Sequence, residues 1–190
     1  MKTSIIIIVL LGLFSCQKKT GEIEQAPAQI VVTNAPVTPI PVIGLEIGNI
    51  APDLNLKDSN NIIIPLSSLR NKIVLIDFWA SWCAQCRHEN LNLKNVYANF
   101  KDTLFKTCKG FEIYGVSRDS NKNAWLNCMK QNNYNWKCNV LDSGDWNTTA
   151  SYLYNIQFLP TNFLIDNNGI IIAKNLRDTM VAKTLISLLK

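Results

Sequence analysis

Hydrophobic residues between positions 45 and 190 fall into strand-like and helix-like segments that alternate along the chain. Residues 72–78 (KIVLIDF) form a nearly continuous apolar run, which is typical of a central strand buried on both faces. From residue 84 to residue 100 the apolar positions recur at helical spacing, which predicts an amphipathic helix. Residues 111–116 (FEIYGV) predict a second inner strand.

Shorter segments complete this pattern. Residues 62–65 are β-branched but end in proline, so they are expected at a sheet edge or in a hairpin arm. Residues 166–169 (DNNG) have the composition that a hairpin turn requires. Further strands are expected at 137–141, 162–165 and 169–173, and helices at 122–131, 148–154 and 181–189. This order predicts an α/β fold in which helices flank a mixed central sheet.

The N-terminal residues have the layout of an export signal. Residues 1–4 carry a positive charge, and residues 5–14 are an apolar run too short to span a bilayer, so we predict a signal peptide over 1–15. Residues 13–16 (LFSC) resemble the lipobox of bacterial lipoproteins, which implies that Cys16 is lipidated and becomes the new N-terminus. The alternative is an ordinary signal cleaved nearby, with Cys16 incidental. A diacylated Cys16 would anchor the protein to a membrane of the bacterial cell envelope, facing the oxidising periplasm.

The composition changes again after Cys16. Residues 16–44 contain four prolines and no clear periodicity, which predicts an extended linker. Residues 45–190 then suit one globular domain, which we expect to be a monomer. The net charge of +5 comes from scattered basic residues without a basic stripe, so nucleic acid is not an expected partner.

Two cysteines, Cys83 and Cys86, stand where the predicted central strand gives way to a helix. Unpaired N–H groups and the positive end of the helix dipole would stabilise a thiolate at Cys83. Cys86 falls one turn later on the same face, within bonding distance. We expect Cys83 to be exposed and acidic and Cys86 to be more shielded, an asymmetry that suits thiol–disulfide exchange.

Metal binding is a weaker interpretation of this pair. A structural zinc site needs four ligands, but the remaining cysteines form no second CxxC motif. The sole histidine, His88, follows Cys86 by two residues, where a helix would turn it away from the pair. Copper delivery would call for a distant histidine, which the chain does not offer. We therefore expect no metal and no cofactor besides a redox-active disulfide.

Two other interpretations concern the sulfur chemistry itself. A thiol peroxidase would be expected to carry proline and threonine shortly before its reactive cysteine, but residues 80–82 are Ala-Ser-Trp. A purely structural bridge across so short a loop would add little stability. Two of the other cysteines, Cys108, Cys128 and Cys138, could form a second bridge. The favoured pair is Cys128 with Cys138, which would tie a helix end to the next strand, and one free thiol would be left.

Residues 77–86 (DFWASWCAQC) resemble the active-site segment of the thioredoxin superfamily. Further motifs narrow the resemblance, which covers residues 44–189, to the TlpA/ResA-like, AhpC/TSA-related group of membrane-tethered thiol–disulfide oxidoreductases. These motifs are APDL at 51–54, LSSLRNK at 66–72, YGVS at 114–117 and LPTNFLID at 159–166 with Gly169. The resemblance implies a thioredoxin-like fold with an N-terminal extension and an inserted αβ element.

The resemblance also implies a role for several residues. Cys83 would attack a substrate disulfide and Cys86 would resolve the mixed disulfide. Pro160 matches the cis-proline of the superfamily, since an X–Pro bond tolerates cis at small cost, and Leu159 would pair with an extended substrate through its backbone. Asp77 matches a buried acid that exchanges a proton with the resolving cysteine; the alternative is an ordinary hydrogen-bonded aspartate at a strand end.

Two further residues carry open alternatives. Glu89 matches a glutamate that tunes the thiols in ResA-like members, but it could equally be a solvated charge on the helix. Trp82 is expected either to shape the docking surface or simply to pack. Gln85 departs from the proline that often precedes the second cysteine in the group.

We expect the protein to be an extracytoplasmic reductant of protein disulfides, in cytochrome c maturation or thiol repair. A membrane electron donor would supply its electrons. The alternatives are a thiol peroxidase and a non-catalytic module that binds a metal or a partner.

Overall fold

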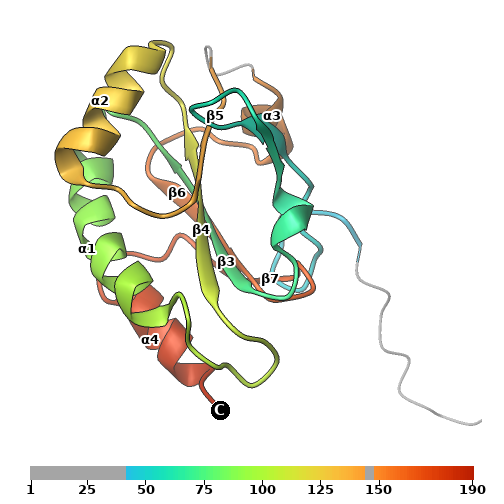
Figure 1. The fold of residues 1–190 in the computed structure, drawn as a ribbon. Helices are drawn as coiled ribbons and strands as arrows, with labels where there is room; N and C mark the ends of the chain where they lie inside the picture. The colour runs from blue at the N-terminus through green and yellow to red at the C-terminus, as the bar shows by residue number, and fades with distance from the viewer. Residues whose placement is uncertain (1–41, 144–147) are drawn as a thin grey trace, which may run out of the picture. The chain divides into compact units, whose positions relative to one another are not determined.

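The computed structural model describes residues 42–143 and 148–190, and their core is one mixed β-sheet. The strands lie in the order β2-β1-β5-β4-β3-β6-β7 (Figure 1). Their bounds are β1 Asn55–Lys57, β2 Ile63–Pro65, β3 Ile73–Trp79, β4 Phe111–Ser117, β5 Cys138–Leu141, β6 Thr161–Ile165 and β7 Ile171–Lys174.

Strands β3 and β4 form the centre of this sheet. They pair in parallel, and β3 pairs on its other side with β6 in the antiparallel direction. Every residue of β3 and β4 is buried, as predicted from their continuous apolar runs. The register sets Asp77 of β3 between Gly115 of β4 and Asn162 of β6, so this aspartate lies in the interior of the sheet.

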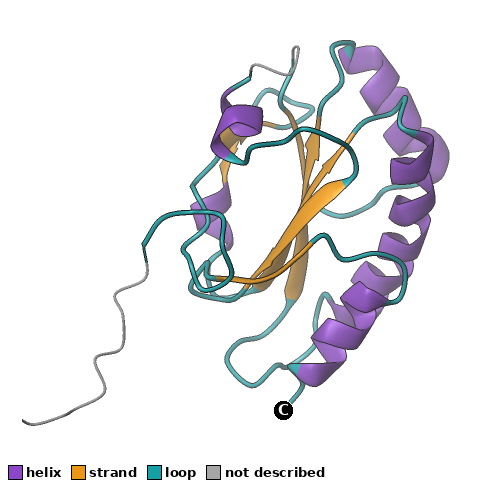
Figure 2. Cartoon of the chain, turned by 180° about the vertical axis from the view of Figure 1, so that it is seen from behind, coloured by secondary structure: helices purple, strands orange, loops and turns teal. Residues whose placement is uncertain are grey.

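Helices cover both faces of the sheet. In Figures 1 and 2, α1 (Ala84–Phe100), α2 (Lys122–Asn132) and α4 (Met180–Ser187) lie on one face and α3 (Thr149–Leu153) lies on the other. Side chains of β3 divide accordingly, since successive residues point to opposite faces of a strand. Ile73, Leu75 and Trp79 join the core beneath α1, α2 and α4, whereas Val74, Ile76 and Phe78 join the core on the α3 side.

The predicted elements are present with small shifts of their bounds, and the mixed α/β architecture is confirmed. The edge position predicted for residues 62–65 is also correct, because β2 is the outermost strand beside β1. Sequence analysis missed β1 and the short 3-10 helix Leu66–Leu69, since neither is long enough to display a period. The predicted signal peptide and most of the predicted linker lie outside the described residues.

The turn between β6 and β7 forms as its composition indicates. The Asp166 carboxylate accepts the N–H groups of Asn168 at 2.9 Å and Ile170 at 2.8 Å. Gly169 has a φ of 84°, and a side chain there would meet the guanidinium of Arg70. The turn therefore needs a residue without a Cβ at this position.

The expected bridge between Cys128 and Cys138 is wrong, because both cysteines are free thiols. Cys128 belongs to the core beneath α1, α2 and α4, whereas Cys138 on β5 belongs to the core on the α3 side. The sheet therefore separates the two thiols. Burial raises the pKa of the Cys128 thiol, and it raises the pKa of Cys138 to about 12, so both are poor nucleophiles. Cys108 is free as well and half-buried.

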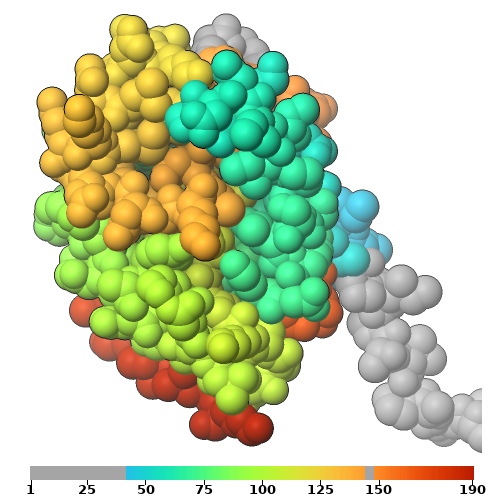
Figure 3. Space-filling model, in the orientation of Figure 1, coloured from blue at the N-terminus to red at the C-terminus, as the bar shows by residue number. Residues whose placement is uncertain are grey.

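A cavity of about 470 Å³ lies on the face shown in Figure 3, where the turn between β1 and β2 meets α2 and the chain leading to β5. Its lining includes Asn60, Met129 and Asn139. None of the candidate residues predicted from the sequence lines it, so the cavity is separate from the site described below. Within the described ranges, no helix is both long and apolar enough to cross a membrane.

Candidate active site

Cys83 and Cys86 form a disulfide at the start of α1. Cys83 is the N-cap residue of the helix, and its Sγ accepts the backbone N–H of Cys86 at 3.1 Å. The exposed fraction is 9% for Cys83 and 1% for Cys86. The order of exposure is as predicted, but Cys83 is far less exposed than expected, because its sulfur turns back over the end of the helix.

The peptide bond between Leu159 and Pro160 is cis, as the resemblance implied. Leu159 is half-buried and packs against the core cluster that contains Cys83 and Cys86. Two aromatic side chains in the adjoining sequence face solvent. Trp82, directly before Cys83, is 60% exposed, and Phe158, directly before Leu159, is 59% exposed. Sequence analysis singled out Trp82 but not Phe158.

Asp77 is buried on the same face of β3 as Trp79, with an exposed fraction of 2%. Burial disfavours its charged form and raises its pKa from 3.8 to about 7. The positive charge of Arg177 acts in the opposite direction, the negative charge of Glu89 raises the pKa further, and a hydrogen bond from the Asn162 side chain lowers it. A carboxyl group with a pKa near neutrality can both accept and release a proton under physiological conditions.

Glu89 lies on α1, one turn after Cys86, and only 8% of it is exposed. Its Oε2 accepts the backbone N–H of Asp178 at 3.0 Å. Glu89 is therefore a buried, hydrogen-bonded group rather than the solvated surface charge that sequence analysis left open. His88 is exposed and groups with Glu89 and Asp178, their ligand-type atoms lying within 4.8 Å of one another, and not with the cysteine pair.

The loop that precedes the cysteine pair is fixed by side chains that sequence analysis did not single out. Asp119 accepts the Ser81 N–H at 2.9 Å and the Ser81 hydroxyl at 2.5 Å. Arg87 donates to the Ser81 carbonyl at 2.6 Å, and the Ser117 hydroxyl donates to Asp119 at 2.7 Å. These contacts tie the loop to the end of β4 and hold the start of α1 in place.

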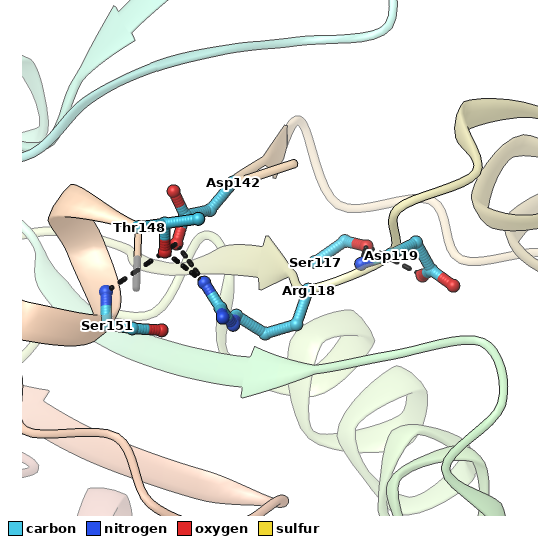
Figure 4. Close-up of polar contacts among 6 residues, drawn as sticks. All are labelled: Ser117, Arg118, Asp119, Asp142, Thr148 and Ser151. Carbon is cyan, nitrogen blue, oxygen red and sulfur yellow. Dashed lines mark hydrogen bonds and ion pairs between the residues drawn. The ribbon is translucent and has the colours of Figure 1, made fainter. Parts of the chain in front are cut away.

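The neighbour of Asp119, Arg118, points the other way. In Figure 4 its side chain extends toward Asp142 and Thr148, while Asp119 extends away from them. The Arg118 guanidinium forms a buried ion pair with Asp142 and also donates to the Thr148 hydroxyl, which in turn donates to Asp142. This cluster links β4, β5 and the start of α3, and it is separate from the cysteine pair.

A family model described as AhpC/TSA family matches residues 47–174. The chain belongs to the AhpC/TSA family. Among curated members, the thiol-disulfide oxidoreductase ResA of Bacillus cereus is 33% identical over 131 residues, which cover 68% of this chain and 69% of ResA. ResA of Bacillus subtilis is 36% identical over 122 residues, covering 64% of this chain and 63% of that protein.

Solved structures agree with this assignment. The thioredoxin domain of a thiol-disulfide oxidoreductase from Bacteroides vulgatus matches with a TM-score of 0.68 and 30% identity, covering 77% of this chain and 100% of that chain. This AhpC/TSA-family chain thus has the predicted thioredoxin-like fold, and it is a ResA-like thiol–disulfide oxidoreductase.

Proposed function

We propose that the protein transfers electrons to protein disulfides in the periplasm, as a reductant that serves cytochrome c maturation or thiol repair. The observation that carries this proposal is the Cys83–Cys86 disulfide at the start of α1, with the cis bond of Pro160 on a loop that packs against the same core cluster. The buried Asp77, with its pKa near neutrality, supplies the proton exchange that the reaction needs.

The reduction would proceed in two balanced steps. The Cys83 thiolate attacks one sulfur of the substrate disulfide, a mixed disulfide forms, and the released substrate thiolate takes a proton from water. Cys86 then gives its thiol proton to the Asp77 carboxylate and attacks the Cys83 sulfur. The Cys83–substrate bond breaks, the second substrate thiolate leaves and is protonated, and the protein disulfide forms. Two electrons have passed from the protein dithiol to the substrate.

The substrate would dock over the exposed aromatic side chains and the cis-proline loop. Trp82 and Phe158 offer apolar contacts, and the backbone of Leu159 would pair with an extended stretch of the substrate. Such backbone pairing is largely independent of side-chain sequence, so it would admit unfolded or extended protein segments that carry a disulfide.

Regeneration requires a thiol donor at the membrane, and the proposal places the protein there. The lipobox-like residues 13–16 support lipidation of Cys16, and the proline-containing linker would hold the domain away from the lipid. The reduced Cys83–Cys86 dithiol carries the two electrons, so the proposed reaction uses no further cofactor or metal. We propose that the protein works as a monomer.

Trapping tests the proposal directly. In Cys86→Ala the second step is blocked, so mixed disulfides between Cys83 and substrates should accumulate in intact cells. They should run as reductant-sensitive adducts that mass spectrometry can identify. The matched control is Cys128→Ala, which removes a buried free thiol outside the pair. This variant should accumulate no mixed disulfides and should reduce insulin at the rate of the unmodified protein.

The alternatives predict different outcomes. Peroxide consumption that survives Cys86→Ser, with no insulin reduction by the unmodified protein, would identify a thiol peroxidase. Stoichiometric metal that is lost in Cys83→Ser would identify a binding module. The anchor is tested separately: Cys16→Ser should move the protein from the membrane fraction to the soluble periplasm, and an unchanged membrane fraction would reject lipidation at this residue.

A further inference from the structure

The loop between β7 and α4 contacts three parts of the active site through three consecutive residues. The backbone N–H and carbonyl of Leu176 bond to the side chain of Asn162, at 2.8 and 2.9 Å, next to Asp77 in the sheet register. The N–H of Asp178 donates to Glu89 at 3.0 Å. Between these two contacts stands Arg177, a residue that neither the motifs nor the family resemblance indicated.

The Arg177 side chain is half-buried and its donors are directed at backbone carbonyls. Nη2 donates to the carbonyl of Pro160, and Nη1 donates to the carbonyl of Leu176 at 2.8 Å. A guanidinium presents its donors in a fixed planar fork, so two carbonyl partners define its position closely. The contact with Pro160 also fixes the residue that bears the cis bond.

This anchoring places a permanent positive charge near Asp77. Other ionisable groups on the neighbouring elements also surround Asp77 and Arg177. Glu89 on α1 acts on Asp77, Tyr134 in the segment after α2 is influenced by Asp77, and Asp178 adjoins Arg177. On reduction, the thiols of Cys83 and Cys86 join them. The Arg177 charge favours the ionised form of Asp77, whereas burial and Glu89 oppose it.

We propose that Arg177 is a positioning residue of the exchange reaction: its guanidinium holds the carbonyl of cis-Pro160 and supplies a fixed positive charge to the surroundings of Asp77, the group that accepts the proton of Cys86. The side chain does not touch the sulfur atoms in this scheme. It acts through Asp77 and through the cis-proline loop, and the proposal rests on the thiol–disulfide exchange argued above.

The first test is the titration of Asp77 itself in the oxidised protein, followed by carbon-13 NMR of its carboxyl carbon. In Arg177→Gln the midpoint should move upward by about one pH unit, because an opposite charge nearby lowers a carboxyl pKa by one unit or more. Arg177→Lys keeps the charge and should stay near the unmodified protein. The matched control Lys174→Gln removes a nearby lysine that donates to the Leu45 carbonyl at 2.9 Å, and it should leave the midpoint in place.

The second test is the rate at which Cys86 resolves a preformed mixed disulfide on Cys83, measured against pH. In Arg177→Gln the rise of this rate should shift to higher pH, with a loss of roughly tenfold below the midpoint that vanishes at high pH. A purely structural role would lower the rate equally at every pH, and that result would overturn the proposal. So would an unchanged Asp77 midpoint in Arg177→Gln.

The two tests separate this proposal from the proposed function. If the unmodified protein resolved no mixed disulfide, the reductase function would fail, yet the NMR titration would still decide the role of Arg177. If Arg177→Gln does not fold, Arg177→Met removes the same charge with an apolar side chain: an Asp77 midpoint shifted upward by about one pH unit supports the proposal, and an unshifted midpoint contradicts it.

Discussion

Asp77 and Asp142 are buried to nearly the same extent, with exposed fractions of 2% and 5%, but they have different surroundings. Asp142 directly follows β5 and receives the Arg118 guanidinium and the Thr148 hydroxyl in direct contact (Figure 4). Asp77 lies within β3, and the guanidinium that acts on it electrostatically, that of Arg177, donates to the carbonyls of Pro160 and Leu176.

The difference separates a structural carboxylate from one that can exchange protons. Asp142 makes a direct ion pair with Arg118 and accepts the Thr148 hydroxyl, so its carboxylate is tied into the structure on both sides. The guanidinium near Asp77, that of Arg177, instead donates to backbone carbonyls. Burial then dominates, and the pKa of Asp77 is raised. Burial alone therefore does not distinguish the two residues, and the contacts of the neighbouring arginine do.

The largest effect should follow from breaking the ion pair. Arg118→Met would leave Asp142 buried without its cationic partner, which typically costs about 3–5 kcal/mol of unfolding free energy. Urea denaturation of the oxidised protein at pH 7 measures this loss. The double variant Arg118→Met with Asp142→Leu should recover most of it, because the unpaired charge is then gone.

An exposed ion pair supplies the control for that experiment. Lys174 and Glu46 lie 2.9 Å apart, with 79% of the Glu46 side chain exposed. Glu46→Gln should change the unfolding free energy by less than about 1 kcal/mol. If Arg118→Met cost no more than Glu46→Gln, the interpretation of Arg118 and Asp142 as a structural pair would be wrong.

The second effect concerns Asp77 and depends on pH. Its pKa in the folded protein is raised from 3.8 to about 7, so its contribution to stability is fully present below about pH 4. That contribution is lost as the pH rises through about 7, because the folded state must then ionise a buried group. Asp77→Asn cannot ionise, so at pH 8 it should be more stable than the unmodified protein by roughly 2–4 kcal/mol.

Urea midpoints of the oxidised proteins between pH 4 and pH 8 test this. The oxidised form is required, since the thiols of Cys83 and Cys86 would otherwise titrate as well. Resolution of the mixed disulfide by Asp77→Asn should slow by about a hundredfold at pH 7, the lower range for loss of a general base. Parallel stability curves for the two proteins would show that folding does not raise the pKa of Asp77.

The sequence predicted the cysteine pair, the cis-proline and the buried acid because each lies in a continuous motif. β3 could be recognised from its apolar run, and Cys83 from its place after that run. The Cys128–Cys138 bridge failed for a physical reason: sequence separation is short, but the sheet stands between the two thiols.

The partners of the carboxylates could not be predicted in the same way. Arg118 is 24 residues from Asp142 and 30 from Thr148, and Arg177 is 17 residues from Pro160. No periodicity connects such positions, because the strand order of the folded sheet brings them together. A charged residue directly after an inner strand, as at Arg118, is the one local signal that could have drawn attention to the pair.

The smallest expected effect tests the other charge that acts on Asp77. Glu89→Gln removes a negative charge but keeps an oxygen that can accept the Asp178 N–H, so the packing should be preserved. Because Glu89 raises the pKa of Asp77, the Asp77 midpoint should move downward, by less than about one pH unit. Asp178→Asn is the control, since it alters an exposed side chain while retaining the backbone N–H. An upward shift in Glu89→Gln, or equal shifts in both variants, would show that the charge of Glu89 does not reach Asp77, and only Arg177 would remain to distinguish its surroundings from those of Asp142.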